Sequence, residues 1–216
     1  MDKGYFDKLA QTVIDGEVEE CVELVKEGLE KGVDPVEAIE KGLARGIMKV
    51  GDDFGAGVVF LPELIMAADV MKQGTQILDE KIRASGTARK TLGSIVIGTV
   101  KGDIHDIGKS VVAAVLQANG FDVADIGIDV PVEGFLKAVR DQGADVLGMS
   151  TLLTLPLQVM GEVIERMKEE GLRDRVRVMV GGCPVTQEFA EEIGADAVGF
   201  DAADAVKKAK SLLDIA

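Results

Sequence analysis

The chain contains a single histidine, His105, within the segment Lys101-Gly-Asp-Ile-His-Asp106. Any imidazole chemistry in this protein must therefore take place at His105. Asp103 lies two residues earlier. A histidine that ligates a metal commonly donates its second ring N–H to a carboxylate, which fixes the tautomer and raises the basicity of the ligand. The types and spacing of Asp103 and His105 are thus those of a metal ligand and its hydrogen-bond partner.

Three interpretations of residues 102–109 are compatible with these residue types. A lone histidine commonly has only a structural role. A glycine-containing loop before a helix can bind phosphate, but Asp103 and Asp106 would repel an anion. The third interpretation is a metal site. One histidine without neighbouring Cys, His or carboxylate ligands cannot build a tetrahedral zinc site, but it can complete the coordination of a metal already held by a macrocycle.

The second half of the chain alternates apolar, strand-like runs with helical patterns. Five such units predict an α/β fold with a parallel sheet covered on both faces. Right-handed crossovers then give a flavodoxin-like, Rossmann-type, doubly wound five-stranded sheet. The predicted strands are 94–100, 122–126, 145–150, 176–180 and 197–200, and the predicted helices are 107–119, 132–142, 157–170, 186–193 and 203–213.

The predicted topology places His105 at a binding position. In doubly wound folds, ligands bind beyond the carboxyl ends of the strands, where the strand order reverses. With flavodoxin-like order, this point lies between the first and third strands. The loops there are 101–106, which contains His105, and 150–154. This placement depends only on the strand pattern and the topological rule.

The first half of the chain predicts an N-terminal four-helix bundle. Asp34-Pro35 is typical of an N-cap followed by Pro at the first helical position. Short joints between helices favour a small bundle. The predicted domains are a helical cap domain (1–85), a linker (86–91) within a polar, glycine-containing stretch, and an α/β domain (92–216). Apolar residues recur at helical spacing in 9–14, 21–29, 39–50 and 61–78, with a break predicted from Gly51 to Gly57.

Composition excludes several classes of function. The formal net charge is −14, which disfavours binding to nucleic acid or to an anionic membrane. No apolar run approaches the ~20 residues needed to span a bilayer, and the N-terminus lacks the apolar core of a signal peptide. We therefore expect a cytoplasmic protein. Cys21 and Cys183 lie far apart and are expected to be reduced thiols.

Three motifs resemble those of one known family. Gly102-Asp103-x-His105-Asp106-x-Gly108 is similar to the D-x-H-x-x-G signature of base-off/His-on cobalamin-binding domains. Such domains occur in cobalamin-dependent methionine synthase and in corrinoid proteins of anaerobic methyltransferase systems. Ser150 in Gly148-Met-Ser-Thr-Leu-Leu-Thr154 matches the S-x-L element, and Gly181-Gly182 matches a later G-G element. The helical first half resembles the family's cap domain, so the similarity covers almost the whole chain.

The resemblance implies roles for the matching residues. His105 would coordinate cobalt from below and displace the cofactor's own dimethylbenzimidazole. Asp103 would accept a hydrogen bond from the far ring nitrogen, and Ser150 would extend this relay, so these three residues form the implied catalytic group. Gly108 would let the first helix approach closely, and Gly181-Gly182 would let the nucleotide tail pass the fourth strand. The implied cofactor-binding set is Gly102, Asp103, His105, Asp106, Ile107, Gly108, Ser150, Leu152, Thr154, Gly181, Gly182 and Cys183.

Two groups of residues keep alternative interpretations. Thr154, like Thr151, suits a hydrogen bond to the cofactor or an ordinary turn cap. Cys183 would lie beside the nucleotide slot, where packing is the expected role. Phe60, Leu61 and Leu64 either cover the upper face of the cobalt or pack within the helical bundle, and core packing is favoured for any single one of them.

The resemblance also implies a function, since cap and cobalamin domains fill the chain. The protein would carry a methyl group on cobalamin, as methylcobalamin in the loaded state, through a Co(I)/methyl-Co(III) cycle. A substrate:corrinoid methyltransferase would load it, an acceptor methyltransferase using tetrahydrofolate or a thiol would unload it, and a reductive activase would rescue it. The chain would not be catalytic alone. Methanol, a methylamine, an aryl methyl ether and a betaine all remain possible donors.

Three alternative functions are kept beside this one. The first is the cobalamin-binding subunit of an adenosylcobalamin-dependent mutase, although such subunits usually lack a helical cap. The second is a cobalamin sensor that regulates transcription, which should carry a basic helix-turn-helix segment. The third is a flavodoxin-like module that binds no cobalamin.

Overall fold

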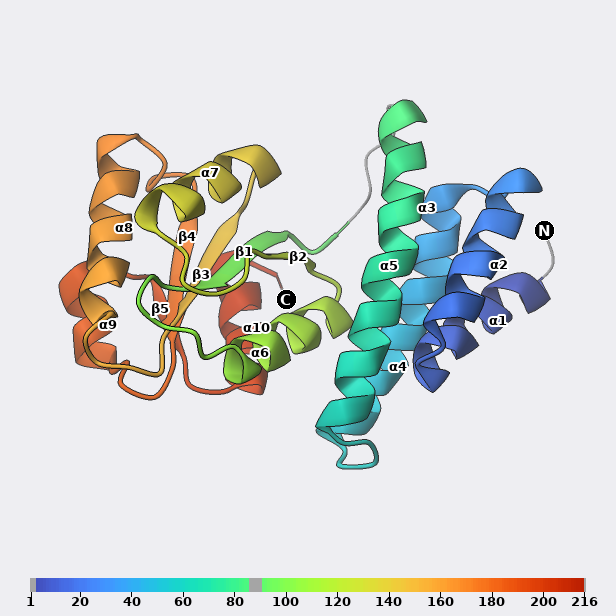
Figure 1. Cartoon of the computed structure of the whole chain (residues 1–216), viewed down its shortest axis with the longest axis horizontal. Coiled ribbons are helices and arrows are strands. Elements are labelled where there is room, and N and C mark those ends of the chain that lie inside the picture. The colour runs from blue at the N-terminus through green and yellow to red at the C-terminus, as the bar shows by residue number, and fades with distance from the viewer. Residues whose placement is uncertain (1–2, 86–90, 216) are drawn as a thin grey trace. The chain divides into compact units, whose positions relative to one another are not determined.

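The computed structural model describes residues 3–85 and 91–215, which form an all-helical unit and an α/β unit (Figure 1). Residues 86–90, most of the predicted linker, lie outside the described residues. The predicted domain boundaries stay a prediction. No helix in the described ranges is long and apolar enough to cross a membrane.

The helical unit contains the four helical segments that the sequence predicts. Asp34 caps the third helical segment, because its carboxylate accepts hydrogen bonds from the backbone N–H groups of Val36 and Glu37 at 2.8 and 3.0 Å. Pro35 follows at the first helical position, where no backbone N–H is needed. The first two segments are α1 (Lys3–Asp15) and α2 (Val18–Glu30). The third is an uninterrupted series of α3 (Pro35–Ala38), the π-helix η1 (Ile39–Leu43) and α4 (Ala44–Gly55), and the fourth is α5 (Leu61–Ser85).

One predicted boundary in this unit is wrong. The break was expected to begin at Gly51, but α4 continues to Gly55. Glycine is tolerated within a helix at a cost of only about 1 kcal/mol. An ion pair between Lys49 and Asp53, one turn apart, bridges the position of Gly51. Such i,i+4 pairs support an exposed helix.

The α/β unit has the predicted topology. Its strands lie in the order β2-β1-β3-β4-β5, and all neighbouring pairs are parallel. The strands are β1 (Ser94–Thr99), β2 (Asp122–Asp125), β3 (Val146–Ser150), β4 (Arg177–Gly181) and β5 (Ala197–Gly199). The helices are α6 (Ile107–Ala118), α7 (Val132–Gln142), α8 (Leu157–Glu169), α9 (Gln187–Ile193) and α10 (Ala202–Leu212).

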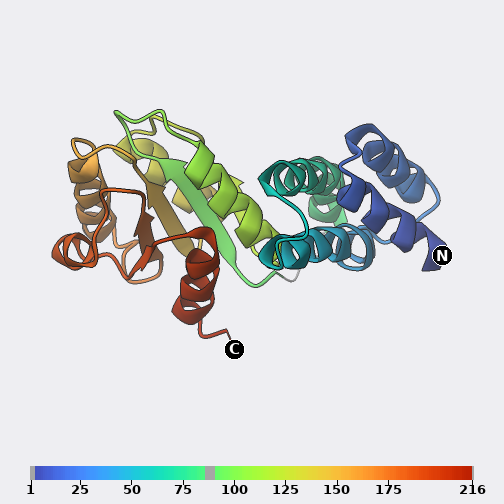
Figure 2. The same ribbon diagram turned by 90° about the horizontal axis from the view of Figure 1, so that it is seen from below.

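The two faces of the sheet have different roles. Val96, Leu147 and Val178 belong to a buried core with residues of α7, α8 and α9. The residues that alternate with them in the strands face α6 and α10, which lie on the other side of the sheet (Figure 2). Ile97 pairs with Gly148, and Gly148 pairs with Met179, so these three share this second face. Glycine at the centre of this face leaves space beside the sheet.

Candidate cofactor-binding site

The loop between β1 and α6 is held by hydrogen bonds from the end of β1 and from the β2–α7 loop. The Thr99 hydroxyl, at the end of β1, donates to the carbonyl oxygen of His105 at 2.9 Å. From the β2–α7 loop, the Asp129 carboxylate accepts from the Gly102 N–H at 2.7 Å, and the Asp129 N–H donates to the Asp103 carbonyl at 3.0 Å. Asp129 has a φ of 52°, a strained backbone conformation for a residue other than glycine. Thr99 and Asp129 were not found by sequence reasoning.

Asp103 and His105 form the expected pair. The Asp103 Oδ1 atom lies 2.5 Å from His105 Nδ1 and also accepts the backbone N–H of His105 at 2.9 Å. Asp103 is only 1% exposed, whereas 48% of the His105 side chain is exposed. Since an ionised carboxylate can only accept hydrogen bonds, Nδ1 is the protonated nitrogen of the neutral imidazole, and the lone pair is on Nε2. The geometry therefore offers Nε2 to a ligand.

The second carboxylate oxygen of Asp103 is held from the β3–α8 loop. Asp103 Oδ2 accepts from the Thr151 hydroxyl and from the Leu152 N–H, each at 2.6 Å. Burial opposes ionisation of Asp103. Hydrogen bonds from Thr151, His105 and Leu152 outweigh that effect and hold the pKa of Asp103 well below its ordinary value. Asp103 is thus a charged acceptor in the folded protein.

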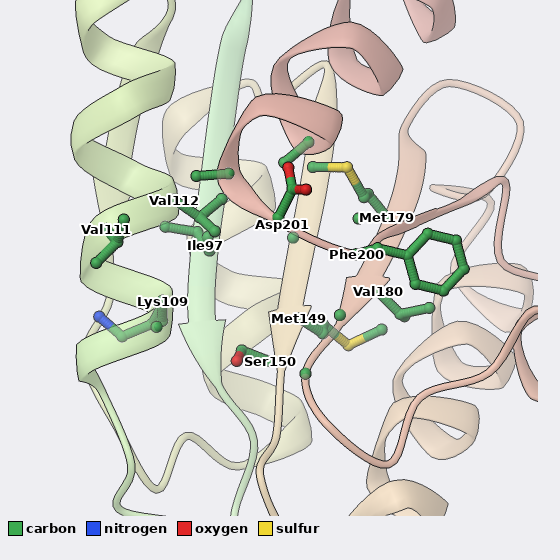
Figure 3. Close-up of a pocket in the computed structure, with 17 residues that line it drawn as sticks. Ile97, Lys109, Val111, Val112, Met149, Ser150, Met179, Val180, Phe200 and Asp201 are labelled. Carbon is green, nitrogen blue, oxygen red and sulfur yellow. The ribbon is translucent and has the colours of Figure 1, made fainter. Parts of the chain in front are cut away.

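The predicted relay partner Ser150 does not reach Asp103, and Thr151 takes that position. Ser150 is the last residue of β3 and pairs in register with Thr99 and Gly181. Its hydroxyl lines the cavity beside α6 (Figure 3). Successive residues of an extended chain point to opposite faces, so Thr151 points to the other side. This alternation was the available signal, but the motif match pointed to Ser150.

A cavity of about 280 Å³ lies between the sheet, α6 and α10 (Figure 3). Most of its lining is apolar or glycine, from Ile97 on β1, Val112 on α6 and Met179 on β4. A second recess, of about 380 Å³, is lined by His105 and the residues that follow it. Both hollows are lined by Gly108, Lys109, Ser150 and Gly182. A ligand bound at His105 could therefore extend past these shared residues into the apolar cavity.

The predicted glycines Gly108, Gly181 and Gly182 all line the cavity beside the sheet. A Cβ added at Gly108 would meet no heavy atom within 4 Å, and Gly108 lines both hollows. Gly182 has a φ of 116°, and its Cβ would lie 1.8 Å from the Thr151 carbonyl oxygen. A Cβ at Gly181 would lie 2.8 Å from the Gly199 carbonyl oxygen. Gly181 and Gly182 thus permit close contact between backbone segments of the protein.

The remaining predicted residues divide into two groups. Asp106, Ile107 and Leu152 line the recess of His105, where Ile107 and Leu152 are exposed apolar side chains. Thr154 lies instead in a separate hollow with Lys101. Cys183 is exposed and lines neither the cavity nor the recess. The structure does not bring Thr154 and Cys183 to the hollows that meet at Gly108.

A buried lysine adjoins both hollows. The side chain of Lys109 is only 2% exposed, and its ammonium forms an ion pair with Asp125 at the end of β2. Figure 3 shows the ammonium directed away from Ser150. A buried charge without a partner is costly, so this pair fastens the start of α6 to the edge of the sheet. The apolar stem of Lys109 then forms part of the cavity wall.

The residues of the proposed upper face differ in burial. Leu64 is completely buried within the helical unit, which supports its core-packing interpretation. Phe60 is 68% exposed and is not a core residue.

Protein donors alone do not account for a metal site here. Within residues 3–85 and 91–215, no three His, Cys, Asp or Glu side chains are grouped to hold a metal ion. His105 therefore supplies one donor. The adjoining hollows at Gly108, one of them apolar, suit a metal carried by a large organic ligand.

Both units of the chain are similar in sequence to known proteins. Residues 93–209 match a family model described as B12 binding domain, and residues 5–79 match a second model of the same description. Dimethylamine corrinoid protein 2 of Methanosarcina acetivorans is 51% identical over 89% of this chain and 87% of its own length. The trimethylamine corrinoid protein of Methanosarcina barkeri is 41% identical over 96% of each chain.

A solved structure agrees with these relatives. A chain in the crystal structure of the methanol:cobalamin methyltransferase complex MtaBC from Methanosarcina barkeri superposes with a TM-score of 0.82. It is 35% identical, and the match covers 95% of this chain and 78% of that chain.

Proposed function

Since this chain belongs to the family of B12-binding corrinoid proteins, we propose that it carries a methyl group on a bound corrinoid, with His105 as the residue that would hold its cobalt. The arrangement of Asp103, His105 and the adjoining hollows carries the proposal. One ring nitrogen is held at 2.5 Å by a buried carboxylate, and the other is free.

Each part of the site has a defined task in this proposal. Asp103 keeps the proton on Nδ1 and makes the imidazole a stronger donor through Nε2. The apolar cavity that Gly108 also lines suits the displaced nucleotide of the corrinoid. When bound, the corrinoid supplies the cobalt that accepts and releases the methyl group. The residues that line the two hollows would position the group.

The partners follow from the carrier role. We propose that a substrate:corrinoid methyltransferase loads the protein, that an acceptor methyltransferase using tetrahydrofolate or a thiol unloads it, and that a reductive activase restores it. Identity to a dimethylamine corrinoid protein is 51%, against 35% for the chain in the methanol complex. This difference favours a methylamine as the donor. A cytoplasmic location stays a prediction.

The ligand assignment is tested by electron paramagnetic resonance of the corrinoid-reconstituted protein in its Co(II) state. The protein must carry no histidine tag, because His105 is then the only imidazole present. With natural nitrogen we expect each cobalt line to split into three, and with ¹⁵N-labelled histidine into two. Ser150→Ala is the matched control that should keep the two-line pattern, whereas any nitrogen splitting in His105→Ala should be the three-line pattern of the cofactor's own dimethylbenzimidazole. Three lines from the wild type labelled with ¹⁵N-histidine would contradict the assignment.

The donor is tested separately. The reconstituted protein, reduced to Co(I), is mixed with either a dimethylamine:corrinoid or a methanol:corrinoid methyltransferase and its methyl donor. We expect methylation, followed by absorbance, to be faster with the dimethylamine enzyme. Faster methylation with the methanol enzyme would overturn the donor proposal and leave the ligand assignment intact.

A further inference from the structure

The β2–α7 loop runs beside the loop that carries His105 and contacts the chain on both sides of this histidine. β2 is the edge strand of the sheet and lies next to β1 (Figure 1). Before His105, the Lys101 N–H donates to the Val130 carbonyl oxygen at 2.8 Å. After His105, the Lys109 ammonium forms an ion pair with Asp125. One neighbouring segment therefore holds the His105 loop at its beginning and at its end.

Asp129 makes two further contacts with the beginning of this loop. Its carboxylate accepts the Gly102 N–H at 2.7 Å, and its backbone N–H donates to the Asp103 carbonyl oxygen at 3.0 Å. Both contacts come from a residue with a φ of 52°. Aspartate enters this left-handed region more readily than most residues, but such a conformation persists only where the surrounding structure fixes it. The contacts with the His105 loop are what fix it at Asp129.

A second aspartate has nearly the same backbone conformation at the other edge of the sheet. Asp214 follows α10 and has a φ of 54°. Its neighbour Leu213 packs against Gly93, which directly precedes β1. Asp214 therefore lies beside the beginning of β1, whereas the His105 loop follows its end. The two aspartates share a conformation but not a location.

We propose that Asp129 is a positioning residue for the cobalt ligand. Through the backbone of Gly102 and Asp103, it holds the His105 loop in place before the corrinoid binds. A loop that is already ordered loses less conformational freedom on binding, so the corrinoid binds more tightly. The purpose of this arrangement rests on the proposed function, but the order of the His105 ring can be measured without a corrinoid.

Three variants separate the carboxylate of Asp129 from its backbone conformation. Asp129→Gly removes the carboxylate and suits a φ of 52°. Asp129→Asn keeps an acceptor oxygen and also tolerates the left-handed conformation. Asp214→Gly is the matched control, because it makes the same replacement at nearly the same φ, away from His105. Any general effect of this replacement on stability is shared by the two glycine variants.

The first measurement is NMR of the protein without corrinoid. His105 gives the only histidine ring signals, and ¹³C relaxation reports the order parameter of the ring. This order parameter should fall in Asp129→Gly. The Gly102 amide should exchange about three- to tenfold faster, as for the loss of one net hydrogen bond. Asp129→Asn and Asp214→Gly should stay near the wild type. A His105 ring that is as ordered in Asp129→Gly as in the wild type would overturn the proposal.

The second measurement uses the corrinoid-reconstituted protein. The dissociation constant for the corrinoid should rise about two- to tenfold in Asp129→Gly, because the loop must then be ordered during binding. It should stay within about twofold of the wild type in Asp129→Asn and Asp214→Gly. In the Co(II) state with ¹⁵N-labelled histidine, Asp129→Gly should show the two-line pattern of His105 mixed with the three-line pattern of dimethylbenzimidazole.

The two measurements keep this proposal distinct from the ligand assignment. Equal changes in Asp129→Gly and Asp214→Gly would show a general effect of glycine and would reject a positioning role for Asp129. If the wild type itself gives no two-line pattern, the assignment of His105 as ligand fails. The ring order measured without corrinoid still decides whether Asp129 positions His105.

Discussion

Replacing Gly108 by alanine should separate folding from cofactor binding. Gly108 is the second residue of α6, and a Cβ there would project into space with no heavy atom within 4 Å. The folded protein without cofactor should therefore accept the methyl group without strain. Alanine is favoured over glycine in helices by up to about 1 kcal/mol, so stability of the cofactor-free protein should stay the same or rise by that amount.

Corrinoid binding should respond in the opposite direction. Gly108 lines both the His105 recess and the apolar cavity, so the added methyl group would occupy space that the corrinoid needs. Forcing an extra methyl group into a filled site costs about 1–3 kcal/mol, and 1.4 kcal/mol corresponds to a factor of ten. The dissociation constant for the corrinoid should therefore rise about 5- to 150-fold.

The chain offers a matched control for this substitution. Gly4 is the second residue of α1 and is likewise surrounded by open space. Gly4→Ala should give the same small gain in stability without any change in corrinoid affinity. Stability is measured by urea unfolding followed by circular dichroism, since the chain has no Trp, and affinity is measured by absorbance titration. A Gly108→Ala protein that binds corrinoid within twofold of the wild type, or that unfolds more easily, would refute the argument.

Four further predictions concern stability, accessibility and pH dependence. Gly182→Ala should destabilise the protein by about 2–4 kcal/mol in urea unfolding, because its φ of 116° is strained for alanine and its Cβ would lie 1.8 Å from the Thr151 carbonyl; an effect below about 0.5 kcal/mol would contradict the close contact. Asp125→Ala should cost about 3 kcal/mol, because it leaves the buried Lys109 ammonium without its partner, and Lys109→Met should cost less; the reverse order would argue against a buried charge. In native protein a thiol reagent should modify the exposed Cys183 quickly and the completely buried Cys21 only after unfolding. Burial also raises the pKa of the Cys21 thiol. The stability gained by keeping this thiol protonated is complete below the unfolded thiol pKa of roughly 8.5, and it is lost as the pH rises through the pKa of Cys21 in the folded protein. The urea midpoint should therefore fall between roughly pH 7.5 and 10, and a fall that is no smaller in Cys21→Ala would exclude this contribution.

Local patterns were sufficient for most of the fold. The helix predicted over 132–142 matches α7 residue for residue, because apolar spacing and a following Gly143 in left-handed conformation both mark it. Every strand was predicted within one or two residues, since buried parallel strands are short apolar runs. The extension of α4 through Gly51 was missed, because a glycine alone does not decide whether a helix continues.

The sequence patterns did not identify residues whose role depends on contacts with other segments. Thr99, Asp129 and Asp125 hold the loop of His105 and the start of α6, yet each is an ordinary residue in its own segment. Their importance arises from neighbours more than five residues away, in adjacent strands and loops. Only the paired register of the sheet brings them together.

The amino-acid sequence by itself determined which residue can ligate a metal and where it lies. It contains one histidine, and the strand pattern together with the rules for doubly wound folds places His105 at the switch point between β1 and β3. Only the tertiary structure decided that Thr151, rather than Ser150, reaches Asp103, and that Gly108 leaves space while Gly182 removes a clash. The physical reason is that composition and periodicity are properties of one segment. The direction of a side chain and the space around a Cβ depend on the register and approach of several segments.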